Sequence, residues 1–272
     1  MDPWRLILDP PLSGEENMAI DEAIVRVMEA YYEDGVEQMP TLRLYSWVKP
    51  TVSIGYTQKA DPFIEREGNG VEPVPFIRRI TGGRAVLHDS EITYSLVCPA
   101  SHPLFSTGIE EAYRAVSLAI TGSLIDLGIE AGFERGSVKR ERGAREDRDA
   151  CFLTPSRYEV TARKKKIAGS AQRRFKGALL QHGSILLNVD KALTEKVFGK
   201  GVAEDIASIN DFTDLGPDAV DNFKGDFIER LADTLDAEFF LSRLSVPEHA
   251  LMQELKDGKY LSREWNERAP HA

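Results

Sequence analysis

The order of helix-like and strand-like segments is the feature that most constrains the fold of this 272-residue chain. The first predicted element is a helix, because Ser13 and Glu16 match a capping box and apolar residues follow at helical spacing as far as Tyr31, before Gly35. The later elements are predicted strands at 41–47, 52–56, 74–79, 92–97, 157–162, 166–173, 179–189 and 237–244, and predicted helices from Asp61 to Gly68, at 109–127, 191–198 and 218–235, and from Pro247. Since these runs lack regular βαβ alternation, the pattern predicts an α+β fold and not a doubly wound sheet.

Composition and charge narrow the classes of function. Hydrophobic residues make up 42% of the chain, so it can bury enough apolar surface to fold. The net charge of -10 disfavours a nucleic-acid binder. No apolar run approaches the roughly 18 residues of a membrane span, and no basic leader precedes an apolar segment at the N-terminus. Two cysteines cannot form a disulfide scaffold and fit a reducing compartment. We therefore expect a cytoplasmic protein that binds neither nucleic acid nor membranes.

A glycine pair among arginines forms the first candidate site. Gly82 and Gly83 lie between predicted strands and are flanked by Arg78, Arg79 and Arg84. Glycines let backbone amides approach a ligand closely, so the loop could bind a carboxyl, thioester or phosphate group. The alternative is a tight turn with surface arginines. A Walker-type phosphate loop is excluded, because no Gly-Lys-Ser/Thr follows at the required spacing.

A basic segment forms the second candidate site. From 161 to 176 there are seven basic residues and no acidic one. We interpret residues 163–165 as a solvated hairpin turn. Lys166 differs, because it precedes the small residues 168–171, which would let a ligand pass close to the strand. A lysine beside such a groove could stabilise developing negative charge or lower the pKa of a thiol.

The cysteines and histidines need separate interpretations. Cys98 ends an apolar strand and is expected to be a buried small hydrophobic residue. Cys151 follows a charged segment, 134–150, that we expect to be a mobile loop, and nearby basic residues could make Cys151 a nucleophile. His88 and His182 could pair with a cysteine, although we favour hydrogen-bonded histidines at strand ends. No His/Cys cluster has the spacing of a zinc site.

Several motifs together resemble a known family. These are NMAIDEA (17–23), RRITGGRAVLHDSEITYS (78–95), CFLTPSRYEV (151–160), KKIAGSAQRRFKGALLQHGSILLN (165–188) and KYLSREWN (259–266). They resemble the lipoate/biotin protein ligase superfamily, and within it the cysteine-dependent octanoyltransferases of the LipM type. The resemblance implies a mixed β-sheet flanked by helices, with a catalytic domain at 1–246 (core about 37–246) and a helical tail at 247–272 packed on it.

The resemblance also implies roles for residues. The counterpart of Cys151 is the acyl-thioester nucleophile, and the counterpart of Lys166 lowers the pKa of that thiol and polarises the acyl carbonyl. The implied substrate-binding residues are Arg79, Thr81, Gly82, Gly83, Arg84, His88, Gly169, Ser170, Ala171, His182 and Gly183. The sequence departs from the family pattern at Leu153, Thr154 and Arg157. These departures leave open the geometry of the loop or of the partner contacts, but they do not change the implied chemistry.

The implied activity is transfer of octanoyl from octanoyl-acyl carrier protein to a lysine of lipoyl domains, such as glycine-cleavage H protein or E2 subunits. No cofactor or metal is expected, and we expect a monomer. Three alternatives stay open: an ATP-dependent lipoate ligase, an amidotransferase between lipoyl domains, and a carrier-protein binding module without catalysis. Lipoate ligases usually carry glycine where Arg84 stands, and they commonly have a further C-terminal domain for which the residues after Val246 leave no room.

Overall fold

Eight strands form one mixed sheet in the computed structural model, which describes residues 1–64, 74–106, 109–133 and 159–268. The order across this sheet is β11-β1-β2-β6-β10-β9-β8-β7. The strands are β1 (Asp2–Leu12), β2 (Thr41–Trp47), β6 (Glu91–Pro99), β7 (Ala131–Phe133), β8 (Val160–Ala162), β9 (Lys165–Arg174), β10 (Ala178–Leu186) and β11 (Ala237–Ser242). β1 is parallel to both β11 and β2, whereas the other neighbours pair antiparallel. The predicted α+β class with a mixed sheet is therefore confirmed.

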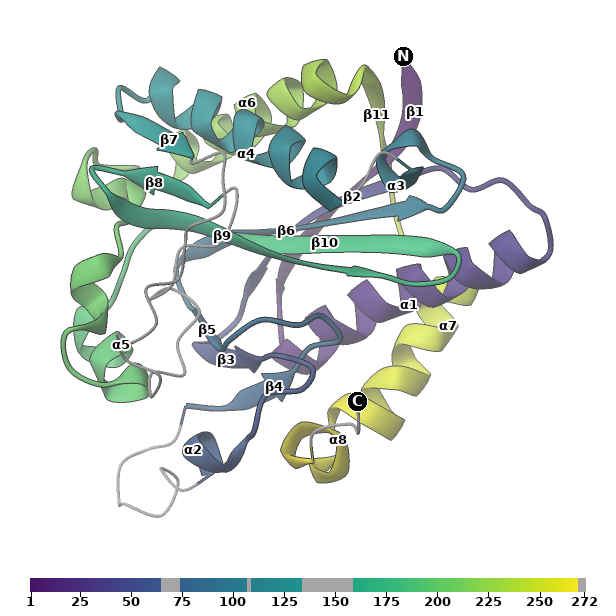
Figure 1. The fold of residues 1–272 in the computed structure, drawn as a ribbon, viewed down its shortest axis with the longest axis horizontal. Helices are drawn as coiled ribbons and strands as arrows, with labels where there is room; N and C mark the ends of the chain where they lie inside the picture. Colours follow the sequence, from purple (N-terminus) through teal and green to yellow (C-terminus); the bar gives the residue numbers. More distant parts are fainter. Residues whose placement is uncertain (65–73, 107–108, 134–158, 269–272) are drawn as a thin grey trace.

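A second sheet of three strands lies beside the large one (Figure 1). Its central strand, β3 (Thr51–Ile54), runs parallel to β4 (Phe76–Arg78) and antiparallel to β5 (Val86–His88). These short strands hold the glycine-rich loop 79–85 between β4 and β5. The small sheet thus places the loop close to the large sheet.

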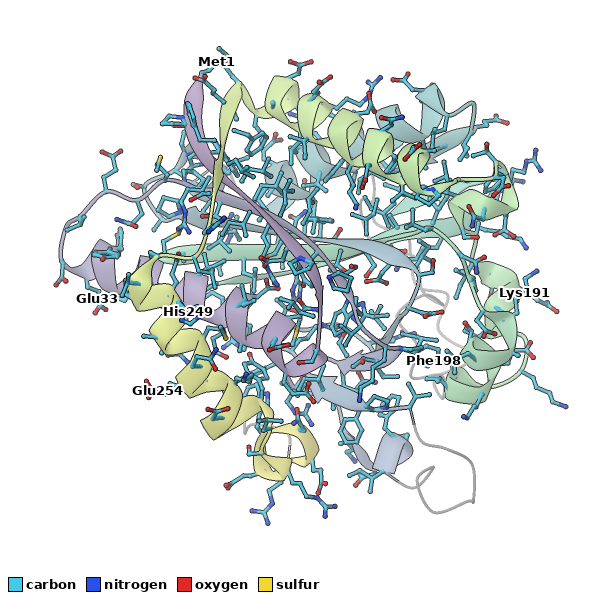
Figure 2. The ribbon with its side chains drawn as sticks, turned by 180° about the vertical axis from the view of Figure 1, so that it is seen from behind. Met1, Glu33, Lys191, Phe198, His249 and Glu254 are labelled. Carbon is cyan, nitrogen blue, oxygen red and sulfur yellow. The ribbon has the colours of Figure 1, made fainter. Side chains whose placement is uncertain are left out.

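Helices cover both faces of the large sheet. α1 (Gly14–Glu33) and α7 (Val246–Leu255) pack on one face, and α4 (Ile109–Asp126) and α6 (Pro217–Leu235) pack together on the other (Figure 1). Figure 2 shows α7, marked by His249 and Glu254, running beside α1. The shorter helices are α2 (Asp61–Ile64), α3 (Pro103–Ser106), α5 (Lys191–Phe198) and α8 (Arg263–Glu267), with 3₁₀ turns at Val202–Asp205 and Ile209–Asp211 and a π turn at Lys256–Tyr260.

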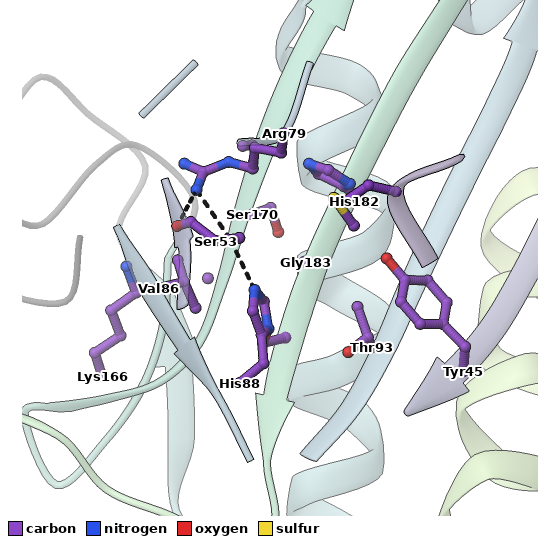
Figure 3. Close-up of a pocket in the computed structure, with 14 residues that line it drawn as sticks. Tyr45, Ser53, Arg79, Val86, His88, Thr93, Lys166, Ser170, His182 and Gly183 are labelled. Atoms are coloured by element: carbon purple, nitrogen blue, oxygen red, sulfur yellow. Dashed lines mark hydrogen bonds between the residues drawn. The ribbon is translucent and has the colours of Figure 1, made fainter. Parts of the chain in front are cut away.

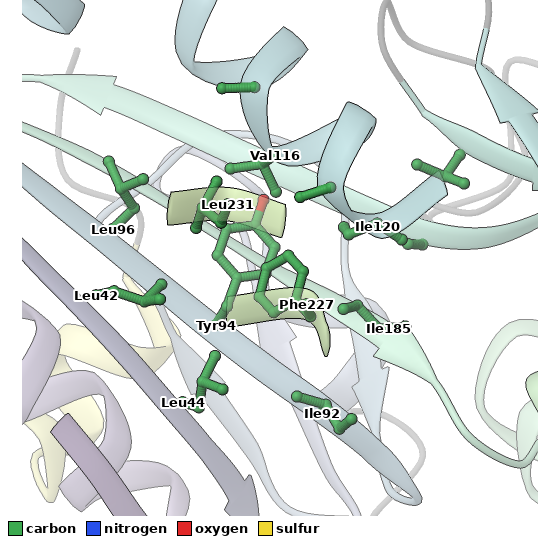
Figure 4. Packing of buried hydrophobic residues seen from close by; sticks show 14 of the residues in the cluster. Leu42, Leu44, Ile92, Tyr94, Leu96, Val116, Ile120, Ile185, Phe227 and Leu231 are labelled. Atoms are coloured by element: carbon green, nitrogen blue, oxygen red, sulfur yellow. The ribbon is translucent and has the colours of Figure 1, made fainter. Parts of the chain in front are cut away.

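Successive side chains of a strand point to opposite faces of the sheet, so the apolar residues of the central strands are divided between two cores. Along β6, Ile92, Tyr94 and Leu96 belong to the core under α4 and α6, where they meet Phe227 (Figure 4). Val97, on the opposite face, belongs to the core under α1. Both faces of the central strands are buried, so packing on both sides fixes the register of these strands. No helix in the described part of the chain is long and apolar enough to cross a membrane.

The first predicted helix is confirmed with its cap. The Ser13 hydroxyl accepts from the Glu16 amide at 3.2 Å, and the Ser13 amide donates to the Glu16 carboxylate at 3.2 Å. The chain leaves the helix through Gly35, whose φ of 70° favours glycine. The tail after Val246 also begins with a capping box, formed by Ser245 and Glu248.

Several short or unusual elements were not predicted. β1 contains Pro3, Pro10 and Pro11, which weaken the strand signal, yet Trp4 and Leu6 are buried and the strand pairs on both sides. β5, β7 and α3 have only three or four residues, too few to show periodicity. Residues 134–150, the end of the helix predicted to reach Gly68, and the start of the strand predicted at 157 lie outside the described residues.

Candidate active site

A cavity opens between α1, the large sheet and the small sheet (Figure 3). Its empty volume is about 460 Å³, including the solvent space at its mouth. Its walls are formed by Met18, Tyr45, Ser53, Arg79, Val86, His88, Thr93, Lys166, Gly169, Ser170, Ala171, His182, Gly183 and Ser184. Residues from α1, β2, β3, the glycine-rich loop, β5, β6, β9 and β10 therefore converge on one cavity.

The structure brings most of the predicted site residues together. The predicted residues that line the cavity are Lys166, Arg79, His88, Gly169, Ser170, Ala171, His182 and Gly183. Thr81, Gly82, Gly83 and Arg84 form the adjoining loop instead, with Thr81 buried and the two glycines exposed. Cys151 lies outside the described residues.

Lys166 is buried at the cavity wall next to a glycine. Its side chain is 5% exposed, and Nζ lies 2.5 Å from Oε1 of Glu159. A Cβ on Gly169 would lie 2.5 Å from Cε of Lys166, so the lysine passes directly over the glycine and would have to move to make room for a side chain there. Gly169 thus leaves the space that the lysine occupies.

Arg79 holds the glycine-rich loop in place. Its guanidinium donates to the carbonyls of Gly82 at 2.7 Å and of Arg84 at 2.8 Å. It also donates to the carbonyl of Ser53 at 2.8 Å and to the Thr81 hydroxyl at 3.2 Å. The arginine that was predicted to contact a ligand therefore joins the loop to β3 and at the same time lines the cavity.

His182 connects this loop to α1. Its Nε2 lies 2.7 Å from the Thr81 hydroxyl, and its Nδ1 lies 3.0 Å from Oδ2 of Asp21. Burial lowers the pKa of His182, and the hydrogen bond to Asp21 only partly offsets it. Burial would raise the pKa of Asp21, but the hydrogen bond from His182 and the Arg43 guanidinium hold that pKa below its usual value. A neutral ring that donates to an ionised carboxylate follows from both shifts, so Nε2 accepts from Thr81.

His88 has a similar pair of partners. Its Nδ1 lies 2.7 Å from Oε1 of Glu91, and its Nε2 lies 2.8 Å from the Ser53 hydroxyl. The ring also stacks on Trp47, with centroids 4.0 Å apart. The favoured prediction, that both histidines are hydrogen-bonded, is confirmed, although His182 lies within β10 and not at its end.

Tyr94 supports the floor of the cavity from the other side of the sheet. Its hydroxyl lies 2.5 Å from the Ser170 hydroxyl, and burial raises its pKa to about 12. A Cβ on Gly183 would lie 2.4 Å from the Gly169 carbonyl, so the adjacent strands also need a glycine there. Small residues at these positions keep the cavity open.

The remaining predictions concern Cys98 and the hairpin. Cys98 is fully buried in the core under α4, and burial raises the pKa of its thiol well above the usual value, which confirms its structural role. Arg163 and Lys164 have positive φ values of 47° and 66° in the turn between β8 and β9, and both are exposed with Lys165. The solvated hairpin is therefore confirmed.

Several polar residues of the site were not predicted, among them Asp21, Ser53, Glu91 and Glu159. Each contacts a predicted residue: Asp21 is 161 positions from His182, whereas Glu91 is only three positions from His88. The motifs 17–23, 78–95 and 151–160 were the available signals for Asp21, Glu91 and Glu159. Among the described residues, no group of three His, Cys, Asp or Glu side chains could hold a metal ion.

Comparisons with known proteins add to this geometry. The family profile of the Lipoyl protein ligase A/B catalytic domain matches residues 13–232. The chain is 38% identical to octanoyltransferase LipM of Kyrpidia tusciae, over 98% of this chain and 100% of the relative. It is 37% identical to octanoyltransferase LipM of Brevibacillus brevis, over 98% of this chain and 99% of the relative. A solved chain of a bi-partite lipoate protein ligase from Thermoplasma acidophilum, from an archaeal lipoylation system, has a TM-score of 0.75 and 26% identity, covering 100% of this chain and 99% of that one.

Proposed function

Since this chain belongs to the lipoyl protein ligase A/B catalytic-domain family, in the group of the LipM octanoyltransferases, we propose that it transfers octanoyl from octanoyl-acyl carrier protein to a lysine of a lipoyl domain through a thioester on Cys151. The observation that carries this proposal is similarity over nearly the full length of both chains. Family membership identifies an enzyme, which decides against a binding module without catalysis.

The proposed reaction has two acyl-transfer steps. The Cys151 thiolate attacks the carbonyl of the carrier thioester, so one thioester replaces another at little cost in free energy. The ε-amine of the acceptor lysine then attacks the enzyme thioester, and the amide that forms is more stable. The covalent intermediate allows two large proteins to meet the enzyme in turn, and it makes ATP unnecessary.

The cavity supports this chemistry on the enzyme side. Lys166 lies at its wall as a buried cation paired with Glu159, where it can stabilise negative charge on an acyl oxygen. Gly169, Ser170 and Ala171 follow along β9 and would form one wall for the acyl chain. The loop 81–84, held by Arg79, would form the opposite wall.

The basic hairpin 163–165 is the proposed contact for the protein substrates. It precedes Lys166 directly, so it lies next to the cavity and carries three exposed positive charges. Acyl carrier proteins and lipoyl domains are typically acidic, and opposite charge would guide both to the same entrance. Glycine-cleavage H protein is the acceptor that we propose first, with E2 subunits as others.

The test is intact-mass analysis after mixing the enzyme with octanoyl carrier protein, without ATP. We expect one hydroxylamine-sensitive octanoyl adduct on wild type, no adduct on Cys151→Ala, and an unchanged adduct on the control Cys98→Ala, since Cys98 is buried. Full transfer by Cys151→Ala would contradict the mechanism.

The structural similarity to a lipoate protein ligase supports a second candidate function, that of an ATP-dependent ligase. An ATP-dependent ligase would activate free lipoate as an adenylate and would not need Cys151. Transfer from free acid that requires ATP and survives Cys151→Ala would support that candidate. Transfer only from an octanoylated lipoyl domain would instead indicate an amidotransferase.

A further inference from the structure

Three side chains of the cavity region form a continuous hydrogen-bonded line. The Ser53 hydroxyl lies 2.8 Å from Nε2 of His88 (Figure 3). Nδ1 of His88 lies 2.7 Å from Oε1 of Glu91. Ser53 and His88 both line the cavity. Hydroxyl, imidazole and carboxylate in this order make up the arrangement in which a histidine takes a proton from a hydroxyl while a carboxylate holds the ring.

The surroundings fix His88 in this orientation. Trp47 stacks on the ring at an interplanar angle of 11°, and its Nε1 donates to Thr93 at 2.9 Å. Thr93 and Ser184 both donate to Oε1 of Glu91. Oε2 of Glu91 is buried and has no hydrogen-bond partner in the described part of the chain. The hydroxyls of Thr93 and Ser184 thus orient the Glu91 carboxylate, and His88 is the ionisable side chain that pairs with it.

The proposed second step requires a proton acceptor. When a neutral amine attacks a thioester, its nitrogen becomes positively charged and must lose a proton before the amide is stable. Lys166 is engaged in an ion pair with Glu159. Arg79 donates to the Ser53 hydroxyl at 3.1 Å, and this positive charge also disfavours an ammonium ion nearby.

We propose that Ser53, His88 and Glu91 form the proton relay for the acceptor lysine in the amide-forming step. The lysine nitrogen bonds to the acyl carbon, the carbon–sulfur bond breaks, and the sulfur leaves as a thiolate. The nitrogen gives its proton to the Ser53 oxygen while Ser53 gives its own to Nε2 of His88. Glu91 balances the imidazolium charge until that proton reaches the thiolate. This relay rests on the octanoyl transfer proposed above.

A second line, Thr81–His182–Asp21, is less suited to this role. It has the same order of groups, with distances of 2.7 and 3.0 Å. However, Thr81 is not among the residues that line the cavity, whereas Ser53 is. The His182 line therefore connects the glycine-rich loop to α1, whereas the His88 line ends at a hydroxyl that lines the cavity.

The experiment separates the two half-reactions. Octanoyl-enzyme is formed from octanoyl carrier protein and isolated, and its decay is followed by mass after adding either a lipoyl-domain acceptor or hydroxylamine. Hydroxylamine is a weakly basic nucleophile whose adduct gives its proton to water, so it does not need the relay. The variants are Ser53→Ala and His88→Gln. The controls are Ser123→Ala, a buried serine in α4, and His102→Gln, a histidine paired with Asp2 away from the cavity.

We expect both variants to transfer octanoyl to the lysine about 100-fold more slowly than wild type, while their reaction with hydroxylamine and their formation of octanoyl-enzyme change far less. The controls should resemble wild type in every step. Equal slowing with lysine and hydroxylamine in Ser53→Ala, or an unchanged rate with lysine, would overturn the relay. If wild type forms no octanoyl-enzyme, the proposed function itself fails, which is a separate outcome.

Discussion

The contact between Lys166 and Gly169 shows how one missing side chain can determine a site. A Cβ at position 169 would lie 2.5 Å from Cε and 2.8 Å from Nζ of Lys166. Both atoms are at the flexible end of the lysine, so the lysine would move and β9 would remain paired. The main consequence of a methyl group there is a displaced cation, not an unfolded strand.

We therefore predict that Gly169→Ala separates activity from stability. The free energy of unfolding should stay within about 1 kcal/mol of wild type, measured by urea denaturation. Octanoyl-enzyme should form about tenfold more slowly or worse, because a charge displaced by even 1 Å loses much of its effect. Gly132→Ala in β7 is the control, since a Cβ there meets no atom within 4 Å. Full activity of Gly169→Ala would show that the position of Lys166 is unimportant.

At the residue scale, the sequence predicted which glycines and basic residues belong to the site better than it predicted the polar residues that contact them. Runs such as 168–171 are unusual enough to be noticed from composition alone. Glu91 and Glu159 lie inside the quoted motifs 78–95 and 151–160, but, like Ser53, they are ordinary polar residues in strand-like segments and their partners cannot be inferred locally. Ser53 meets His88 only because β3 and β5 pair, so its role depends on a register that local sequence does not specify.

At the element scale, α8 completes the edge of the small sheet. The Trp265 indole donates to the Arg78 carbonyl at 2.9 Å, and the Asn266 side chain accepts from the Arg78 amide at 2.9 Å. The buried Arg78 guanidinium in turn donates to the carbonyls of both residues. Since Arg79 follows directly, the motif at 259–266 supports the strand from which the glycine-rich loop begins.

Trp265→Phe should loosen this attachment, because it removes the indole donor and keeps an aromatic ring. We expect the free energy of unfolding to fall by about 1–3 kcal/mol, as for a hydrogen bond lost at a partly buried carbonyl. Hydrogen exchange should also become faster in residues 77–84. Glu264→Gln, on an 82% exposed side chain of the same helix, is the control. Unchanged exchange in 77–84 would mean that α8 does not support the loop.

The elements that sequence predicted well are those with a long periodic pattern or a cap. α1 combines a capping box with buried residues at helical spacing, and both signals are local. β1 is different, because its three prolines resemble a loop and only pairing with β2 and β11 makes it a strand. Its place inside the sheet also shows that residues before 37 contribute to the core.

At the scale of the whole molecule, the large sheet places a cluster of basic side chains at one turn of an acidic protein. The net charge is -10, yet the turn at 163–165 exposes three consecutive positive side chains beside the cavity. β9 then extends for 10 residues to a second turn, where Lys176 pairs with Glu33. The α+β architecture followed from the order of elements, whereas this separation of charge required the strand pairing.

Lys165→Glu should weaken the encounter with carrier protein, since it replaces an attractive charge beside the entrance with a repulsive one. We expect KM for octanoyl carrier protein to rise several-fold at low salt with kcat nearly unchanged, and the difference from wild type to shrink as salt is added. A small neutral octanoyl thioester should react equally with both proteins, because it has no charge to guide. Lys176→Glu changes the net charge by the same amount roughly 30 Å away along β9, so it should behave as wild type. Equal effects of both substitutions would indicate a response to overall charge, and would contradict docking at the hairpin.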